Sequence, residues 1–580
     1  MTRTPTSSSK TRPPHAAGTL RAPLRARHAA LIVFTVAILW RAVYLVGIAG
    51  TACLDINLDP ISDMEAFHRW ALSLAQGDWL DRGGFHPWHP WQEAVAPRSQ
   101  WDAWYGRSFH QEPFYPYSIA LAYLVGPRQP FTMILVQAVL GAAGCAAVCL
   151  LARRVAGPGP GLTAGLLAAV YGPFLYYESL MLRDALMIPL HAFMLWAIVE
   201  ARARRGGRRA AVWWGVAGAL LGVSFVTKAS ILPFVVVAAA LAVADGRRQP
   251  GSGPRAAAVA ALMAGFVALL IPPMARNAVV GAPLLQLTTR GPIEFINGNN
   301  PWHPGIGWFD GDDARVSAYA RQTLAQAEGR LGPTIARVLG DWKGRPLDLA
   351  GLQLRKLGYF FAPFEMPNNA SYGWFRLNSA VLRYATLSFL WLSPLAALGL
   401  LTTAPRRAAL LPVYAFLVLG VATTVAFYVI ARFRAPLMPA ILVFAGSGAW
   451  WLWERLRGLE FGRLSAGLAL VVVLLGVNAS VNYPDDAFVR PQDHLIAIQG
   501  YRQRGDLPRA LEEAKQGRSR FPEFPQFWRE AGMIEMELGR PAEALASLKE
   551  ALSRNPRDEA VRQAVERLQG RFAPDILPPR

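Results

Sequence analysis

The chain carries little charge for its length. Only 17% of its 580 residues are Asp, Glu, Lys or Arg, whereas about a quarter are charged in soluble domains. Hydrophobic residues make up 53%. This balance excludes an ordinary cytosolic enzyme and indicates a membrane protein. The chain also lacks a glycine-rich phosphate loop of the Walker type, which disfavours coupling to ATP.

Cysteine is scarce as well. The three cysteines are Cys53, Cys145 and Cys149, and the last two fall inside an apolar run. The sequence therefore offers no disulfide framework for exported loops. Cys145 and Cys149 are interpreted as small core residues.

The charge that is present is mostly positive, with a formal net charge of +20. The basic residues lie between long apolar runs rather than on polar helices, so nucleic acid is not the expected partner. Residues 1–28 contain basic but no acidic residues and predict a disordered cytoplasmic tail.

Long apolar runs predict an all-α transmembrane bundle of about 11 spans within residues 29–483. The first run is too long for the core of a signal peptide and is interpreted as a retained span. The runs cover residues 29–50, 130–152, 161–177, 182–200, 210–227, 229–244, 256–275, 380–402, 408–430, 436–453 and 463–481.

Residues 114–126 form a shorter apolar run whose placement decides the topology. If this run stays at the outer surface, every arginine-rich loop faces the cytoplasm, as the positive-inside rule requires. The N-terminus is then cytoplasmic, and outer loops 51–130 and 277–379 and the C-terminal segment lie outside. The predicted location is the cell (inner) membrane. Whether residues 113–128 cross it is left open.

The C-terminal segment is polar and contains an internal repeat. The motif that begins at Gly505 recurs 34 residues later at Gly539, and Phe521-Pro522 recurs as Asn555-Pro556. This period resembles tetratricopeptide repeats, which bind protein partners. The alternative is a chance helical hairpin. Residues 491–570 form the predicted repeat domain, and residues 571–580 form a tail. The helices are expected at 493–504, 508–520, 525–538, 541–553 and 557–570.

Ionisable residues in the outer loops are the candidates for chemistry, because charges at the edge of a bundle are costly to place. Asp63 opens a short amphipathic helix, although it could simply cap that helix. Glu112 precedes an apolar helix, and Glu178, Arg183 and Asp184 share one outward turn. Lys228, Arg432 and Arg434 are cations on the same face.

These carboxylates and cations suit transfer of a group from a phosphate. A carboxylate would act as general base on an acceptor hydroxyl, and Lys228, Arg432 and Arg434 would stabilise charge on the departing phosphate. For Arg432 and Arg434, the alternative is that both arginines contact lipid headgroups.

A divalent metal site is a weaker alternative. His86 and His89 occur in the sequence FHPWHPW, and His110 lies near Glu112. Their spacing matches no strong metal-binding template, so an aromatic loop at headgroup level is favoured. No cofactor is assigned.

The order of motifs along residues 29–483 resembles the GT-C membrane glycosyltransferases. One span is followed by an early Asp on a juxtamembrane helix, then HQEPFYPY, then VYGPFLYYESLMLRDALMIPL. The nearest branch contains protein O-mannosyltransferases and lipid A aminoarabinose transferases. The resemblance implies that Asp63 is catalytic, that Glu112 is the acidic residue after the first loop, and that the outward cations hold a lipid phosphate. Met64 separates Asp63 from Glu65, so the paired Asp-Glu of some O-mannosyltransferases is absent.

The resemblance implies an inverting glycosyltransferase whose donor is a sugar on polyprenyl phosphate. The acceptor would be a glycan, lipid or protein. Two other functions stay open. One is a polymerase or ligase of lipid-linked glycans, and the other is a non-catalytic membrane scaffold that presents the repeats.

Overall fold

The computed structural model describes residues 25–204, 207–247, 253–308, 311, 313–481 and 485–572. This part of the chain contains no β-strand and only one isolated bridge, between Tyr171 and Leu387. The predicted all-α fold is confirmed. Residues 1–24 of the predicted N-terminal tail and 573–580 of the C-terminal tail lie outside the described residues.

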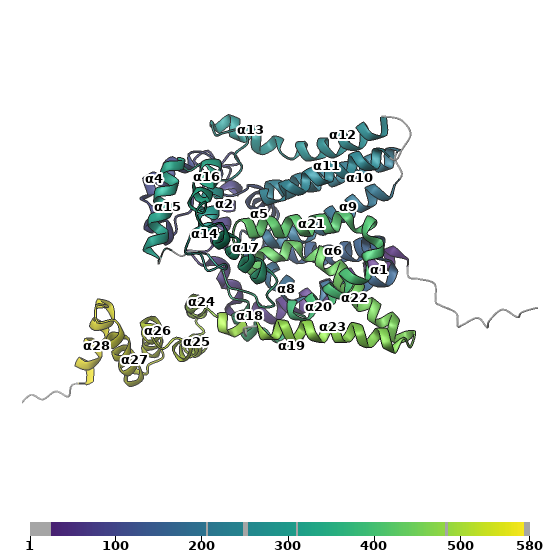
Figure 1. Ribbon diagram of the computed structural model, residues 1–580. Coiled ribbons are helices and arrows are strands. Elements are labelled where there is room, and N and C mark those ends of the chain that lie inside the picture. The colour runs from purple at the N-terminus through teal and green to yellow at the C-terminus, as the bar shows by residue number, and fades with distance from the viewer. Residues whose placement is uncertain are drawn as a thin grey trace, which may run out of the picture.

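Seven helices in the described ranges are long and apolar enough to cross a membrane. The protein is therefore a multi-pass membrane protein, and Figure 1 shows these long helices lying alongside one another. They are α1 (Ala26–Ala49), α6 (Pro130–Ala156), α9 (Arg183–Ala203), α10 (Gly207–Thr227), α21 (Arg407–Ala426, preceded by η3, Ala404–Arg406), α22 (Met438–Arg457, preceded by η4, Ala431–Leu437) and α23 (Phe461–Ser480).

The remaining predicted spans are shorter or broken. α12 (Gly253–Ala268) and α13 (Ile271–Val280) bend by 42° at their junction and could together form an eighth span. The others form α7 (Pro158–Ala169) and α8 (Gly172–Glu178), α11 (Leu232–Arg247) after η2 (Ala229–Ile231), and α20 (Phe389–Thr402). The count of about 11 full-length spans is therefore not reproduced by these helices.

The run at 161–177 breaks for a local reason. Pro173 lies in the first turn of α8, where its missing N–H needs no partner. The chain pairs instead with a distant segment: the Leu387 N–H donates to the Val170 carbonyl at 2.9 Å, and the Gly172 N–H donates to the Leu387 carbonyl at 2.9 Å. The sequence pattern showed that residues 161–177 are hydrophobic, but it did not show that the helix breaks between α7 and α8.

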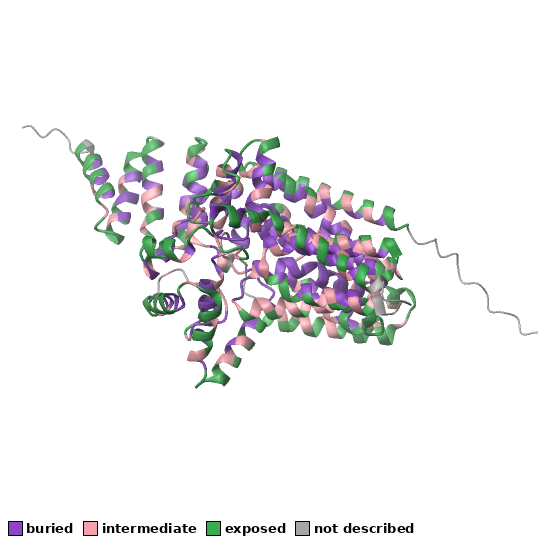
Figure 2. Cartoon of the chain, turned by 90° about the horizontal axis from the view of Figure 1, so that it is seen from above, coloured by how far each residue is buried: buried purple, intermediate pink, exposed green. Residues whose placement is uncertain are grey.

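The centre of the bundle is formed by α9 and α22. In their most apolar stretches 83% and 78% of residues are buried, against 6% for α23, which lies at the edge. Figure 2 shows the same gradient, with buried residues concentrated inside the bundle. Polar groups that project from the ends of α9 and α22 are therefore held by a packed scaffold.

Short helices gather at one end of the bundle, on the left in Figure 1, and we call this the site end. Residues from both long loops pack together there, including Trp91 and Trp101 with Ile296 and Trp342. The elements are η1 (Ala52–Leu58), α2 (Asp63–Ala75), α3 (Pro90–Val95), α4 (Arg98–Tyr105), α5 (Phe114–Val125), α14 (Gly291–Asn299), α15 (Ala314–Ala327), α16 (Leu331–Asp341), α17 (Pro346–Phe360), α18 (Tyr372–Asn378) and α19 (Ala380–Tyr384).

Five helices follow η5 (Asp485–Phe488) and form a C-terminal array. They are α24 (Pro491–Gln503), α25 (Leu507–Arg520), α26 (Pro525–Glu537), α27 (Pro541–Arg554) and α28 (Glu559–Phe572), close to the predicted bounds. Gly505 and Gly539 occupy equivalent turns with φ of +74° and +71°, a conformation that favours glycine. The identification as tetratricopeptide repeats and the domain boundary remain predictions.

Candidate active site

Asp63 is the first residue of α2, and Ser62 caps this helix. The Ser62 hydroxyl accepts a hydrogen bond from the Glu65 N–H at 3.2 Å. Because Ser62 fills the capping position, the Asp63 side chain is available for other contacts. The apolar face of α2 fixes the helix, with Met64, Phe67 and Trp70 buried.

The Asp63 carboxylate lies in a dense set of donors. Both terminal nitrogens of Arg432 donate to its Oδ2 at 3.1 Å, and the Asn369 amide donates to the same oxygen at 2.8 Å. Gln111 donates to Oδ1 at 3.4 Å. Burial alone would raise the pKa of Asp63, but the positive charges of Arg432 and Arg290 and the Asn369 hydrogen bond hold this pKa well below its usual range.

Asp184 and Lys228 extend the cluster away from Asp63. Asp184 lies 3.9 Å from Arg432 Nε and 3.6 Å from Lys228 Nζ. Lys228 Nζ also stands 3.5 Å from the centre of the Phe433 ring. Burial lowers the pKa of Lys228 to about 8, although the negative charge of Asp184 acts in the opposite direction.

Glu112 and Arg183 form a tighter pair beside these residues. Arg183 donates to Glu112 Oε2 at 2.5 Å, and the Ala229 N–H donates to Oε1 at 2.9 Å. Glu112 therefore connects the start of α9 with the residue after Lys228. We define the charged cluster as Asp63, Glu112, Arg183, Asp184, Lys228 and Arg432.

Glu178 and Arg434 lie outside this cluster. Glu178 pairs with Arg41 at 2.6 Å, and Arg434 pairs with Glu365 at 2.6 Å, with both pairs buried. Arg434 also faces the Phe389 ring at 3.9 Å. The sequence predicted that both residues lie at the outer end of the bundle with the other candidates. Their side chains instead pair with Arg41 and Glu365. We leave them out of the proposed site.

The candidate metal ligands lie among aromatic rings. His86 stacks on Tyr105 at 4.8 Å between ring centres, and the His110 ring lies 5.9 Å from His86. Burial lowers the pKa of His86, His89 and His110, so the neutral imidazoles are favoured. Across the described residues no three His, Cys, Asp or Glu side chains are grouped to hold a metal ion. The geometry fits an aromatic loop.

Sequence reasoning singled out none of three polar residues near Asp63, namely Gln111, Asn369 and Arg290. Asn369 comes from a loop with no distinguishing motif. Arg290 precedes α14, and its guanidinium lies over the rings of Trp308 and Trp91 at 5.1 and 5.6 Å. In the sequence, no motif distinguishes Arg290 from the other arginines of the second outer loop, residues 277–379. Only the fold shows that its charge acts on Asp63.

An apolar pocket lies beside Lys228, between α9, α11, α21 and η4. Its wall combines apolar side chains, among them Ile231, Phe234, Phe416, Leu419 and Phe433, with the polar side chains of Lys228, His191, Ser230, Thr423 and Thr424. A small, mostly apolar pocket with a cation at one side suits the anionic head of a ligand and the apolar atoms next to that head.

The fold and the charged cluster define an all-helical membrane protein with buried charges at one end of its bundle. Residues 110–275 match the family model for dolichyl-phosphate-mannose-protein mannosyltransferase. This match confirms the GT-C resemblance over the segment that it covers. That segment contains Glu112, Arg183, Asp184 and Lys228, but neither Asp63 nor Arg432. No curated protein sequence matches the chain.

Solved structures provide a more distant likeness. The chain is 16% identical to the Archaeoglobus fulgidus oligosaccharyltransferase in its apo form, with a TM-score of 0.44, covering 81% of this chain and 56% of that chain. It is also 16% identical to ArnT from Cupriavidus metallidurans bound to undecaprenyl phosphate, with a TM-score of 0.39, covering 90% and 79%. The chain thus spans about half the length of the archaeal enzyme.

Proposed function

We propose that the protein is a membrane glycosyltransferase that moves a sugar from a polyprenyl-phosphate donor to an acceptor hydroxyl at the site end. One observation carries the proposal: Asp63, Arg432, Asp184 and Lys228 form a continuous chain of alternating charges beside an apolar pocket. The match of residues 110–275 to a family of lipid-phosphate sugar transferases supports it.

The proposed donor site divides between the pocket and the cations. The part of the polyprenyl chain next to the phosphate would lie at the pocket, and the phosphate would meet Lys228 and Arg432. Within the described residues Arg432 Nε and Asp184 Oδ1 are buried without a hydrogen-bond partner. Unpaired buried polar atoms are costly, so a phosphate that accepts from Arg432 would be stabilised there.

The proposed reaction is a single displacement with inversion. The acceptor oxygen forms a bond to the anomeric carbon while the bond from that carbon to the phosphate oxygen breaks. The acceptor proton passes to Asp63, and polyprenyl phosphate leaves with its charge balanced by Lys228 and Arg432.

Arg432 links donor binding to the basicity of Asp63 in this proposal. Without donor, both terminal nitrogens of Arg432 engage the Asp63 carboxylate, which makes it a weak base. A donor phosphate that draws Arg432 away would raise the pKa of Asp63. The base would then gain strength only when there is a sugar to transfer.

The proposed location is the cytoplasmic membrane, with the site end outside. Short loops at the opposite end of the bundle are rich in arginine, among them Arg154, which lies 3.6 Å from Glu200, and Arg202, which lies 2.9 Å from Asp245. An excess of basic residues is typical of the cytoplasmic side.

The test compares Asp63→Asn with Glu65→Gln, a matched change on the same helix. Glu65 pairs with Arg69 and does not belong to the charged cluster. Membranes with each variant would be supplied with polyprenyl-phosphate sugars, and release of polyprenyl phosphate would be measured along with the glycans and glycolipids of the cells. We expect loss of transfer only with Asp63→Asn. Full transfer by this variant would overturn the proposal.

A further inference from the structure

The C-terminal array is docked on the site end by its first helices. Arg504 donates to the Thr51 carbonyl at 3.2 Å and pairs with Asp55, and Arg509 donates to the Gly50 carbonyl at 2.8 Å. The Tyr501 hydroxyl accepts from the Ala52 N–H at 3.3 Å. These contacts fasten the array to the segment after α1, and they do not reach the charged cluster.

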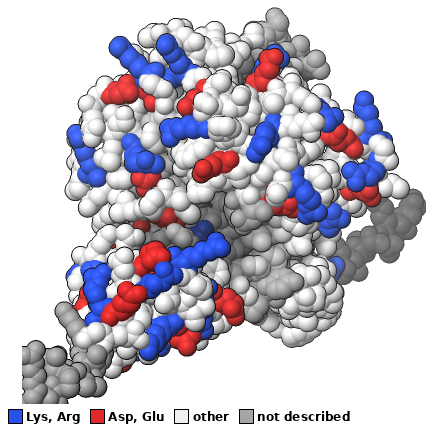
Figure 3. Space-filling model, turned by 90° about the vertical axis from the view of Figure 1, so that its left-hand side faces the viewer, with Lys and Arg blue, Asp and Glu red and all other residues white. Residues whose placement is uncertain are grey.

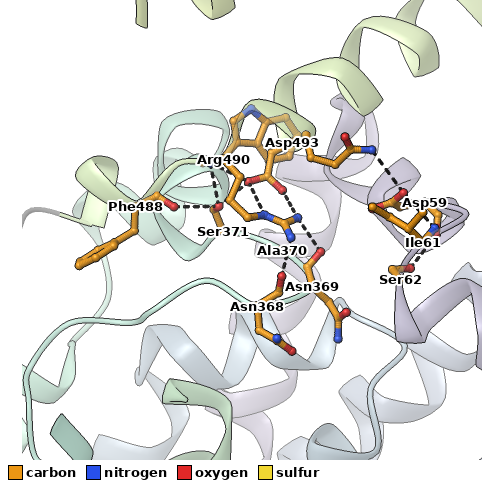
Figure 4. A network of polar contacts seen from close by, with 12 residues as sticks. Asp59, Ile61, Ser62, Asn368, Asn369, Ala370, Ser371, Phe488, Arg490 and Asp493 are labelled. Atoms are coloured by element: carbon orange, nitrogen blue, oxygen red, sulfur yellow. Dashed lines mark hydrogen bonds and ion pairs between the residues drawn. The ribbon is translucent and has the colours of Figure 1, made fainter. Parts of the chain in front are cut away.

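A second set of contacts, drawn in Figure 4, goes from the start of α24 to residues 361–371, the loop between α17 and α18. Arg490 donates to the Asn369 carbonyl at 2.7 Å and also to the Asn368 carbonyl. Asp493 holds the same guanidinium at 2.6 Å and is fully buried. The Ser371 hydroxyl lies between Asp493 and the Phe488 carbonyl.

The loop that Arg490 holds carries the amide that contacts Asp63. Asn369 donates from its side chain to Asp63 Oδ2 at 2.8 Å, and its side-chain oxygen accepts from the Asp63 N–H at 3.3 Å. The loop has no regular hydrogen-bond ladder of its own, because it lies outside any helix. Arg490 therefore binds the main chain of the residue whose side chain brackets Asp63.

The same helix also reaches the turn before α2. Gln492 lies 3.5 Å from Asp59 Oδ1, which accepts from the Ile61 N–H at 3.3 Å. The Asp59 carbonyl accepts from the hydroxyl of Ser62, the cap of α2, at 2.8 Å. Asp63 is thus approached from two sides by segments that α24 contacts.

We propose that Arg490, at the start of the C-terminal array, is a positioning residue that sets Asn369 against Asp63. The array is then a working part of the active site. This inference rests on the proposed function, since Asp63 is the group that is positioned. An arginine suits the task because its planar fork can hold two carbonyls and one carboxylate at once.

A purely structural role for Arg490 would give a different result in a double-mutant cycle. The variants are Arg490→Ala, Asn369→Ala and both together, in the full chain in membranes. Arg504→Ala is the matched control, since it loosens the docking of the same helix without touching the loop. If Arg490 acts through Asn369, the double variant is no slower than the slower single variant.

We expect Arg490→Ala and Asn369→Ala each to lower kcat about tenfold with little change in KM, the scale of one hydrogen bond to a charged group. The acid limb of the pH profile should move to higher pH in both, because Asp63 loses a hydrogen bond that favours its ionised form. Arg432, Arg290 and His89 also act on Asp63 and are unchanged in these variants. Arg504→Ala should keep the wild-type acid limb.

Hydrogen–deuterium exchange of residues 361–371 provides a readout that needs no substrate. Exchange should rise with Arg490→Ala, rise less with Arg490→Lys, and stay unchanged with Arg504→Ala. If Arg490→Ala does not accumulate, Arg490→Lys takes its place in the cycle.

Two results would overturn the inference: multiplicative losses in the double variant, or equal effects of Arg490→Ala and Arg504→Ala. Active Asp63→Asn would instead remove the proposed function, and the exchange data would still show whether Arg490 orders the loop.

Discussion

Two kinds of buried charge lie within this bundle, and they differ in how completely they are paired. In the Arg41 and Glu178 pair, two guanidinium nitrogens meet both carboxylate oxygens at 2.6 and 2.7 Å, and the side chains are 2% and 3% exposed. In the charged cluster, Asp184 lies 3.6 to 3.9 Å from its cations, beyond hydrogen-bond distance.

We expect the closed pair to serve stability and the open arrangement around Asp184 to serve ligand binding. A closed pair satisfies its own groups and leaves no room for a ligand: a Cβ added at Gly141 would lie 2.1 Å from Glu178 Oε1. Around Asp184 the cluster instead keeps two cations near a carboxylate without saturating them, and we expect these cations to be the donors that a phosphate recruits. Breaking each kind of site should therefore give a different phenotype.

The largest effect is expected from Asp63→Asn. Loss of a general base lowers rates by about a hundredfold to ten-thousandfold, so transfer should fall by about a thousandfold. The melting temperature should fall less than in Arg41→Met, because Asp184 stays beside Arg432 after the charge of Asp63 is lost. Single-turnover assays measure the rate. A large fall in melting temperature would show that Asp63 mainly stabilises the fold, as the Arg41 and Glu178 pair does.

The next effect is on stability. Arg41→Met leaves Glu178 buried and unpaired, which should cost about 3 to 5 kcal/mol of unfolding free energy. Adding Glu178→Met should recover most of this loss, because both charges are then absent. Fluorescence-detected unfolding in detergent measures the shift. Equal loss in the single and double variants would contradict this account.

A smaller effect is expected on donor affinity. Lys228→Ala should weaken binding of undecaprenyl phosphate about tenfold, since one charge-assisted contact is lost. Lys343→Ala is the control, because Lys343 is an exposed lysine of the site end. Binding can be followed by microscale thermophoresis in nanodiscs. Equal loss with both variants would assign the effect to overall charge.

The smallest effect is a pH dependence. With a pKa of about 8, Lys228 is charged below that pH and neutral above it. Affinity for undecaprenyl phosphate should therefore fall about threefold to tenfold from pH 7.5 to 9, while a phosphate monoester, with a second pKa of about 6, keeps its charge. Lys228→Arg should flatten the profile. A flat wild-type profile would show that Lys228 does not bind the phosphate.

Local patterns in the sequence predicted much of the molecule. Hydrophobic runs located the long helices, since a bilayer demands length and apolarity from each segment by itself. The 34-residue period located the helices of the array, and Gly505 and Gly539 occupy equivalent turns because each repeat must reverse direction at the same point. Because successive spans run in opposite directions, the sequence predicted that Asp63, Lys228 and Arg432 lie at the same end of the bundle.

Only the tertiary structure shows which charged residues pair with one another. Nothing near Glu178 or Arg434 in the chain indicates that Arg41 and Glu365 neutralise them, and no motif marks Asn369 or Arg490. Hydropathy and charge act residue by residue and can be read along the chain. Hydrogen bonds need approach within about 3 Å in a suitable direction, which only packing of distant segments provides. The sequence determined which end of the bundle gathers the candidate residues, and the fold determined which charges there are left incompletely paired.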